Sequence, residues 1–167
     1  MELWDVYDHC FQKTGRLHER GNPLPSGEYH LVVAVYPVNS QGQVLIQRRN
    51  PNLKLLPGIW AATGGSAVAG EDAWAACQRE LYEELGLCAT KENTEMVAVF
   101  KRIDSFNTLW IVHTDVKAEE LVLQKEEVSD AKWVTVAELK EMAREGTFHY
   151  YRYLDWLTDY ISNMRCS

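Results

Sequence analysis

The chain has 167 residues, 46% of them hydrophobic, and a formal net charge of −7 at pH 7. This length predicts one domain, residues 1–167, with enough apolar side chains for a hydrophobic core. The acidic charge argues against broad binding to nucleic acid or to an anionic membrane, because both partners require a basic face.

Three absences in the sequence narrow the class of protein further. No apolar run is long enough to span a bilayer. The N-terminus, MELWDVYDHC, is acidic and lacks the form of a signal peptide. The four cysteines are scattered and form no zinc motif. We therefore expect a cytoplasmic protein with reduced thiols.

Residues 1–28 are predicted to form an N-terminal arm ahead of the main core. Residues 3–7 and 16–19 are expected to be short strands joined near Thr14–Gly15, and a loop follows from Asn22-Pro23. Such an arm covers a sheet edge, borders the substrate pocket or contacts a partner subunit. The sequence leaves these alternatives open.

The predicted strands of the core are short runs rich in β-branched or aromatic residues. They are residues 31–36, 43–48, 60–63, 96–102, 108–114 and 131–134. The first two form a hairpin around the turn at residues 39–42. The strands on either side of the turn at residues 104–107 form a second hairpin.

Three helices are predicted from apolar residues at helical spacing. Glu71 and Asp72 open the first, and Gly86 ends it. The second covers residues 136–145, and the third covers residues 148–163, with Tyr150 on its apolar stripe. Strands and helices interleave irregularly, which predicts an α/β fold whose mixed sheet is covered by helices on both faces.

The first predicted helix carries three neighbouring carboxylates. Glu80, Glu83 and Glu84 are three and four residues apart, so they share one polar arc. Each like-charge pair costs roughly 0.2–0.5 kcal/mol, which Arg79 offsets only in part. Such hard oxygen ligands suit Mg²⁺ or Mn²⁺. The alternative is a solvated acidic helix face.

The stretch from Gly65 to Leu87 carries a longer pattern, G-x5-E-x7-R-E-U-x-E-E-x-G-U, in which U is aliphatic. Its specified positions are filled by Gly65, Glu71, Arg79, Glu80, Leu81, Glu83, Glu84, Gly86 and Leu87. By average residue usage, a chance match is on the order of one in 10⁹ per window. This pattern is the Nudix box, and the chain resembles the Nudix hydrolases.

The resemblance implies the Nudix α/β/α sandwich and a divalent-metal-dependent hydrolase. Members mostly cleave a nucleoside diphosphate linked to another moiety, in the presence of Mg²⁺ or Mn²⁺. The implied partner is thus a small phosphorylated molecule, a nucleotide derivative. Metal ions would polarise its phosphoryl oxygens and activate a water that attacks phosphorus.

Carried over residue by residue, the resemblance assigns the metal to Glu80, Glu83, Glu84 and the carbonyl of Gly64. Arg79 completes the catalytic set by holding the glutamates in place through charge-assisted hydrogen bonds. Glu71 braces the loop ahead of the helix.

The general base stays open at this stage. Across the family it is a glutamate of the box or a distal one. Glu80 and Glu83 are the candidates within the box, while Glu126 and Glu127 are distal candidates in an acidic loop. A solvated loop pair is the alternative for the latter two.

Several residues outside the box are candidate substrate contacts, each with a structural alternative. Arg48 and Arg49 would meet a phosphate or lie on the surface. An aromatic ring would stack on a base or belong to the core. His30 would face the pocket or serve the fold. The aromatic candidates are Trp60, Phe106 and Trp110.

Part of the scaffold resembles the Nudix branch that contains isopentenyl diphosphate isomerase. The arm, His30 and the "LPGIW" turn carry this likeness. That enzyme uses a cysteine beside the box entrance, where this chain has Gly64 and Ser66, so we expect hydrolysis rather than isomerisation.

Three further alternatives concern activity and assembly. One is a ligand-sensing Nudix domain without activity, and another is RNA pyrophosphohydrolase activity, against which the acidic charge counts. Many Nudix hydrolases are dimers, so a homodimer is also open. Its interface candidates are Trp4, Tyr150, Tyr151 and Trp156.

Overall fold

The computed structural model describes residues 1–164, so Cys166 lies outside the described residues. The elements are β1 (Leu3–Tyr7), β2 (Lys13–Glu19), β3 (His30–Val38), β4 (Val44–Arg49), β5 (Trp60–Ala61), β6 (Thr63–Ser66), α1 (Ala73–Leu85), β7 (Thr94–Lys101), β8 (Ser105–His113), the 3₁₀ turn η1 (Ala118–Glu120), β9 (Val128–Val134), α2 (Val136–Glu145) and α3 (Leu154–Met164). Within residues 1–164, no helix has the length and apolar character needed to cross a membrane.

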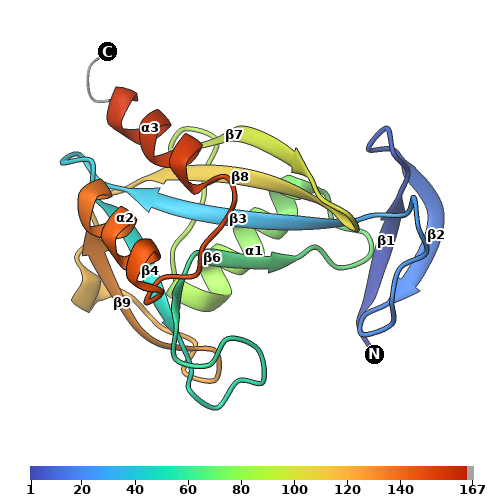
Figure 1. Cartoon of the computed structure of the whole chain (residues 1–167), viewed down its shortest axis with the longest axis horizontal. Helices are drawn as coiled ribbons and strands as arrows, with labels where there is room; N and C mark the ends of the chain where they lie inside the picture. The colour runs from blue at the N-terminus through green and yellow to red at the C-terminus, as the bar shows by residue number, and fades with distance from the viewer. Residues whose placement is uncertain (165–167) are drawn as a thin grey trace.

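The core is a seven-stranded mixed sheet in the order β5-β4-β3-β8-β7, with β6 added to β3 and β9 added to β4 (Figure 1). The central pair, β3 and β8, is parallel. Strands β3 and β4 form the predicted hairpin but pair only beside its turn, at Val38 and Val44. Beyond that point they separate, and β6 pairs with β3 in the space between them. This separation admits the segment that carries Gly64 and Gly65.

Helices cover both faces of the sheet, which confirms the predicted α/β/α sandwich. Successive side chains of β3 point to opposite faces of the sheet, and both faces are buried. Leu31, Val33 and Val35 pack in the cluster with α1. The side chains between and after them pack in the cluster with α2 and α3; they are Ala34, Tyr36 and Val38.

The arm forms the predicted two-stranded sheet, β1 with β2, at the end of the molecule opposite α2 and α3 (Figure 1). Its turn lies at residues 8–12 rather than at Thr14–Gly15, which is part of β2. The Asp8 carboxylate accepts hydrogen bonds from the backbone N–H groups of Cys10 and Gln12 at 2.8 and 3.0 Å. Aspartate side chains favour turns because they accept hydrogen bonds from the backbone N–H groups that follow. The chain therefore turns at Asp8 and not at Gly15.

The ends of α1 and α2 lie where capping chemistry predicts them. The Asp72 side chain caps α1, and Gly86 ends it with φ of 69°. Thr135 and Glu138 form a capping box on α2, and Gly146 ends it with φ of 82°. Both glycines adopt the left-handed conformation that other residues avoid.

Several predicted boundaries were wrong. Residues 60–63 cover two strands, β5 and the start of β6, and the strand predicted at residues 131–134 begins at Val128. Strand β8 already begins at Ser105, so the turn after β7 covers residues 102–104 rather than 104–107. Helix α3 begins at Leu154 rather than at residue 148. Phe148 instead forms a β-bridge to Trp60, and the Trp60 carbonyl accepts the N–H of His149 at 2.8 Å. Tyr150 is consequently exposed and not part of a buried stripe.

Candidate active site

Gly64 and Gly65 bring the main chain of β6 into close contact with its surroundings. Gly64 has φ of +147°, and a Cβ there would lie 2.0 Å from the carbonyl oxygen of Val33. A Cβ on Gly65 would lie 2.5 Å from Oε1 of Glu80. Glycine at both positions therefore allows β6 to run between β3 and the carboxylates of α1.

Glu84 is the most deeply buried carboxylate of the box, with 3% of its surface exposed. Its Oε2 accepts hydrogen bonds from the N–H of Gly64 at 3.2 Å and from the side-chain amide of Gln47. Burial raises the pKa of Glu84 to about 8, and the nearby charge of Glu80 adds to the rise. Both of these hydrogen-bond donors to Glu84 are neutral groups, so neither offsets the charge of its ionised form.

Arg79 is surrounded by oxygen acceptors. Its Nε and Nη2 donate to the two oxygens of Glu71 at 2.6 and 3.0 Å. Nη1 donates to Glu80 at 2.9 Å and to Glu83 at 3.2 Å, and Nη2 also donates to the carbonyl of Ser66. These bonds, led by the one to Glu71, raise the pKa of Arg79. Arg79 thus fixes the orientation of Glu80 and Glu83.

The other two carboxylates of the box differ in burial. Glu80 is 9% exposed, and burial raises its pKa against the opposing charge of Arg79. The Glu83 side chain is 47% exposed and reaches Arg79 from the surface. Within residues 1–164, no three His, Cys, Asp or Glu side chains converge into a complete metal site. The protein therefore offers Glu80 and Glu84 as a buried pair of oxygen donors.

Glu127 approaches this pair from a distant part of the sequence. Its charge contributes to the raised pKa of both Glu80 and Glu84. The loop ahead of it is fixed to α1, because the N–H of Gln124 donates to the Glu84 carbonyl at 3.2 Å. Both distal candidates are exposed residues of this loop, and Glu127 is the one whose charge acts on the two buried glutamates.

Two of the aromatic candidates belong to the core. Phe106 and Trp110 are 5% and 7% exposed and pack on the α1 side of the sheet. Trp60 is half-buried, with Nζ of Lys132 4.4 Å from its ring centroid. The structural alternative therefore holds for Phe106 and Trp110.

His30 and the two arginines also have structural contacts. The His30 ring is stacked on Trp4 with centroids 3.9 Å apart, and burial lowers its pKa. Arg48 donates to the carbonyl of Gly58 at 3.0 Å, and Arg49 donates to that of Leu55 at 3.1 Å. The arginines thus brace the loop between β4 and β5.

Two residues beside the glutamates were missed by the sequence analysis. Gln47 is a buried amide in β4, and its Nε2 lies 3.0 Å from Oγ1 of Thr63 as well as against Glu84. The signal was a polar residue directly after the apolar run at residues 44–46 of this strand. Tyr151 lies near Glu84 and Arg49, whose charges act on it, and burial raises its pKa to about 12. Its backbone belongs to the segment that was predicted to be helical.

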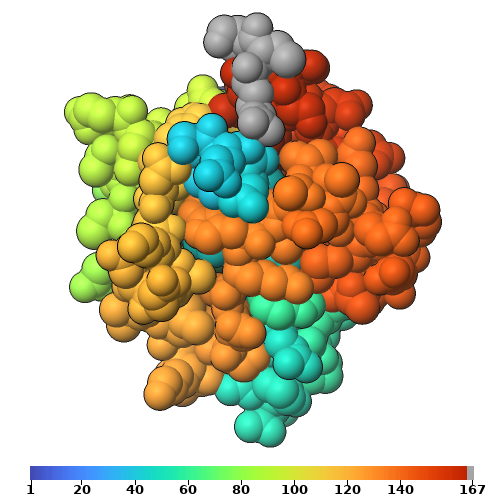
Figure 2. All heavy atoms as spheres, turned by 90° about the vertical axis from the view of Figure 1, so that its left-hand side faces the viewer, coloured from blue at the N-terminus to red at the C-terminus, as the bar shows by residue number. Residues whose placement is uncertain are grey.

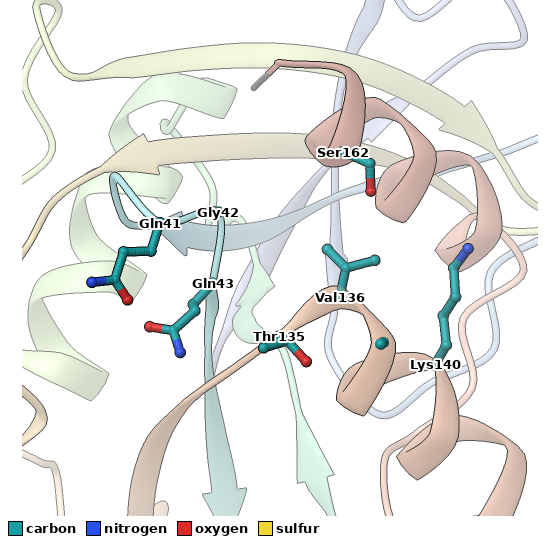
Figure 3. A pocket seen from close by; sticks show the side chains of 8 residues that line it. Gln41, Gly42, Gln43, Thr135, Val136, Lys140 and Ser162 are labelled. Carbon is teal, nitrogen blue, oxygen red and sulfur yellow. The ribbon is translucent and has the colours of Figure 1, made fainter. Parts of the chain in front are cut away.

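A shallow depression of about 650 Å³ lies elsewhere on the molecule. It is formed where the turn after β3 lies beside α2, as Figures 2 and 3 show. Its lining residues are Gln41, Gly42, Gln43, Thr135, Val136, Ala137, Lys140 and Ser162. None of these is a carboxylate, so the buried glutamates, and not this hollow, mark the candidate site.

The family profile of the NUDIX domain matches residues 28–157, which is most of the chain. The chain belongs to the Nudix family. It is 38% identical over 158 residues to an uncharacterised Nudix hydrolase of Listeria monocytogenes, covering 94% of both chains. An isopentenyl-diphosphate Delta-isomerase of Streptomyces avermitilis is 29% identical, over 87% of this chain and 77% of that protein.

Solved structures agree on the Nudix fold. A Deinococcus radiodurans protein superposes with a TM-score of 0.76 at 22% identity, covering 97% of this chain and 98% of that one. The NUDIX domain of Shewanella oneidensis NrtR, solved with ADP ribose, gives 0.62 at 17% identity, over 90% and 94% of the two chains.

These findings confirm the resemblance inferred from the box. The chain is an enzyme of the Nudix hydrolase class, and its family supports a pyrophosphohydrolase-type function. Nudix hydrolases generally use divalent metals. The likeness to the isomerase branch is also found among the relatives. The profile begins at residue 28, so the β1–β2 arm lies outside the matched region, and the single-domain organisation of residues 1–167 stays a prediction.

Proposed function

We propose that this Nudix hydrolase uses Mg²⁺ or Mn²⁺ to cleave the diphosphate linkage of a nucleoside diphosphate joined to another moiety. The observation that carries the proposal is the buried pair Glu80 and Glu84, pressed against the main chain of Gly64 and Gly65. Burial without a cation raises the pKa of Glu84. A hard divalent cation is the partner that such a set of oxygen donors suits.

Four groups of this chain would hold the ion. They are the carboxylates of Glu80, Glu83 and Glu84 and the carbonyl oxygen of Gly64. When bound, the ion supplies positive charge that polarises the phosphoryl oxygens of the substrate. Arg79 keeps Glu80 and Glu83 in place, because its guanidinium donates to both.

Glu127 is our first choice for the general base. It is exposed at the edge of the carboxylate pair, and its charge acts on both members of that pair. A carboxylate in that position can accept a proton from the attacking water while Glu80 and Glu84 remain ligands. Glu80 and Glu83 stay as the alternatives within the box.

The neighbouring Arg49 and Tyr151 are proposed to contact the remainder of the substrate. The charges of Arg49 and Glu84 both act on Tyr151, and the Tyr151 hydroxyl accepts the N–H of Ala62 at 3.3 Å. A guanidinium beside a metal site suits a second phosphate group. We assign this role to Arg49 alongside its bond to the loop carbonyl of Leu55.

Isomerisation of isopentenyl diphosphate is disfavoured by the space at Gly64. A side chain there would meet the backbone carbonyl of Val33 at 2.0 Å, so a cysteine does not fit. The adjacent candidate, Ser66, lacks a thiol. A cytoplasmic location and a small-molecule rather than nucleic-acid partner stay open predictions. So does a homodimer, with Trp4, Tyr150, Tyr151 and Trp156 as interface candidates.

The test is a hydrolysis screen with Mg²⁺ and Mn²⁺. Its panel contains nucleoside diphosphates and triphosphates, nucleotide sugars, dinucleotides, dinucleoside polyphosphates, isopentenyl diphosphate, and ADP-ribose, the ligand of the Shewanella domain. Glu84→Gln runs in parallel, with Glu141→Gln on the exposed face of α2 as the matched control. We expect metal-dependent turnover that Glu84→Gln abolishes and Glu141→Gln retains.

Two other outcomes would change the proposal. Full activity of Glu84→Gln would overturn the metal-site assignment. Binding of a panel member without turnover, in the presence of either metal, would favour a ligand-sensing domain.

A further inference from the structure

The β1–β2 arm is hydrogen-bonded to the loop that enters the Nudix box. The N–H of Ala69 donates to the carbonyl of Leu3 at 2.7 Å, and the N–H of Gly70 donates to Oδ2 of Asp5 at 2.8 Å. Nζ of Lys13 donates to the carbonyl of Glu71 at 3.1 Å. Figure 1 shows this loop, between β6 and α1, running out towards the arm. Residues 1–27 thus contact the box although they lie outside the family match.

Asp5 and Lys13 act as a pair in these contacts. Their side chains are 2.7 Å apart, and 17% and 41% exposed. Burial acts to raise the pKa of Asp5, but the bonds from Lys13 and Gly70 outweigh it and lower that pKa. The bond to Asp5 raises the pKa of Lys13. Both residues are therefore charged at neutral pH, and each bonds to the box loop as well as to the other.

The contacted loop leads directly to the glutamates. Oε2 of Glu71 accepts the N–H of Val68 at 3.0 Å, which ties this side chain to the loop. The same carboxylate accepts two bonds from Arg79. Arg79 in turn donates to Glu80 and Glu83. A continuous set of hydrogen bonds therefore runs from Lys13 to the carboxylates proposed to bind metal.

The space beside Gly70 is open. A Cβ at this residue would meet no atom within 4 Å, and its φ is +93°. A loop with an exposed, positive-φ glycine has many alternative conformations when its hydrogen-bond partners are removed. The bonds from the arm therefore act together with the turn bond from the N–H of Glu71 to the carbonyl of Val68, at 3.1 Å, to select the observed conformation of residues 69–71.

We propose that Asp5 and Lys13 are positioning residues of the active site, which hold the loop at residues 69–71 so that Glu71 and Arg79 orient Glu80 and Glu83. The proposal rests on the proposed function, because it assumes that these glutamates bind metal. It gives the arm a role beyond covering a sheet edge.

The arm also offers a matched control. Arg20 and Glu2 form an ion pair within the same hairpin, with Nη1 and Oε1 2.9 Å apart and the arginine side chain 58% exposed. The Glu2 carboxylate accepts hydrogen bonds from Trp4 and Arg20, so the bonds of this pair stay within the arm. Arg20→Met therefore reports what loss of an ion pair in the arm does to stability alone.

The experiment measures Mn²⁺ binding by isothermal titration calorimetry, together with the melting temperature, for the whole chain. Loss of groups that orient metal ligands weakens metal affinity by roughly 10–100-fold. Arg79 contacts the metal-binding glutamates directly, whereas Lys13 reaches them only through Glu71 and Arg79. For Lys13→Met we therefore expect a loss of Mn²⁺ affinity at the lower end of this range, roughly tenfold. Asp5→Asn keeps an acceptor for Gly70 but loses the charge, so its loss is smaller. Lys13→Arg restores affinity.

The outcomes separate this inference from the proposed function. If wild-type protein binds no Mn²⁺, the proposed function fails. If wild-type protein binds Mn²⁺ and Lys13→Met binds it as tightly as Arg20→Met does, the positioning role is overturned. If Lys13→Met does not fold, the Mn²⁺ affinities of Asp5→Asn and Lys13→Arg are compared instead. Equal affinities overturn the proposal, and a weaker affinity of Asp5→Asn supports it.

Discussion

The Glu84 carboxylate combines deep burial with purely neutral hydrogen-bond donors. Gln47 and the N–H of Gly64 satisfy one oxygen but supply no full positive charge. A buried carboxylate of this kind resists ionisation, because the charged form loses its hydration. Ionisation of Glu84 is therefore unfavourable in the metal-free protein, and a bound cation would make it favourable.

The first prediction concerns Glu84→Gln in the metal-free protein. The folded-state pKa is about 8 and the ordinary value is 4.5. The folded state therefore binds the extra proton between these values, and stability falls as the pH rises through this window. Glutamine keeps an acceptor but has no charge, so the variant should be more stable than wild type above pH 8, by roughly 3–5 kcal/mol at most.

Thermal melts in a chelator at pH 5 and pH 8.5 check this expectation. Glu83→Gln, which removes the exposed carboxylate of the same helix, is the control and should bring no such gain. Parallel melting curves for wild type and Glu84→Gln across the two pH values would contradict the explanation.

The second prediction contrasts two neighbouring glycines. In Gly64→Ala the new Cβ meets the Val33 backbone at 2.0 Å, so the sheet itself must move. We expect a loss of several kcal/mol in the free energy of unfolding, of the size seen for severe strain. In Gly65→Ala the nearest atom is Oε1 at the flexible end of Glu80. That side chain can turn away, so stability changes little while Mn²⁺ affinity falls.

Urea unfolding and calorimetric Mn²⁺ titration of the two alanine variants separate these effects. The reverse pattern, with Gly65→Ala unfolded and Gly64→Ala stable, would mean that β6 does not lie as close to β3 as described.

At the scale of the elements, α2 depends on its capping box. The Thr135 hydroxyl accepts the N–H of Glu138 at 3.1 Å, and the Glu138 carboxylate accepts the N–H of Thr135 at 2.7 Å. Replacing such a cap by alanine typically costs about 1 kcal/mol. Thr135→Ala should therefore lower the free energy of unfolding by about that amount, while Thr135→Ser retains it. Urea denaturation measures both, and catalytic activity should stay unchanged because α2 is remote from the glutamates.

The same elements show what could be predicted from the sequence. The ends of α1 and α2 were predictable because Asp72, Thr135, Gly86 and Gly146 act on their own neighbours. The start of α3 was not, because residues 148–149 bond to Trp60, which is distant in the sequence. Periodicity alone cannot reveal that competing partner.

The candidate site divides in the same way. Glu80, Glu83 and Glu84 follow from spacing on one helix, which is local information. The burial of Glu84 under Gln47 depends on β4 reaching α1, and the effect of Glu127 depends on the loop before β9, which is hydrogen-bonded to α1. These contacts join segments that are distant in the sequence, so a local sequence pattern could not predict them.

At the scale of the whole molecule, metal binding should increase the stability of the fold. A ligand that binds only the folded state adds about 2.7 kcal/mol to the free energy of unfolding at 100 times its dissociation constant. We expect the melting temperature to rise with Mn²⁺ concentration at pH 8 in wild type. The rise should be absent in Glu84→Gln and complete in Glu141→Gln. An equal rise in all three proteins would place the metal elsewhere.

The parallel pairing of β3 with β8 has a consequence for the order in which the molecule assembles. It joins His30–Val38 to Ser105–His113, so the whole Nudix box lies inside the loop that this pairing closes. Contacts between such distant segments form slowly, since the loop entropy is lost before the contacts stabilise it. Helix α1 can form early from local interactions, but Glu80 and Glu84 acquire their surroundings only after the central strands meet. In stopped-flow refolding we therefore expect helical circular dichroism to recover before Mn²⁺ binding does, and simultaneous recovery would argue against this sequence of events.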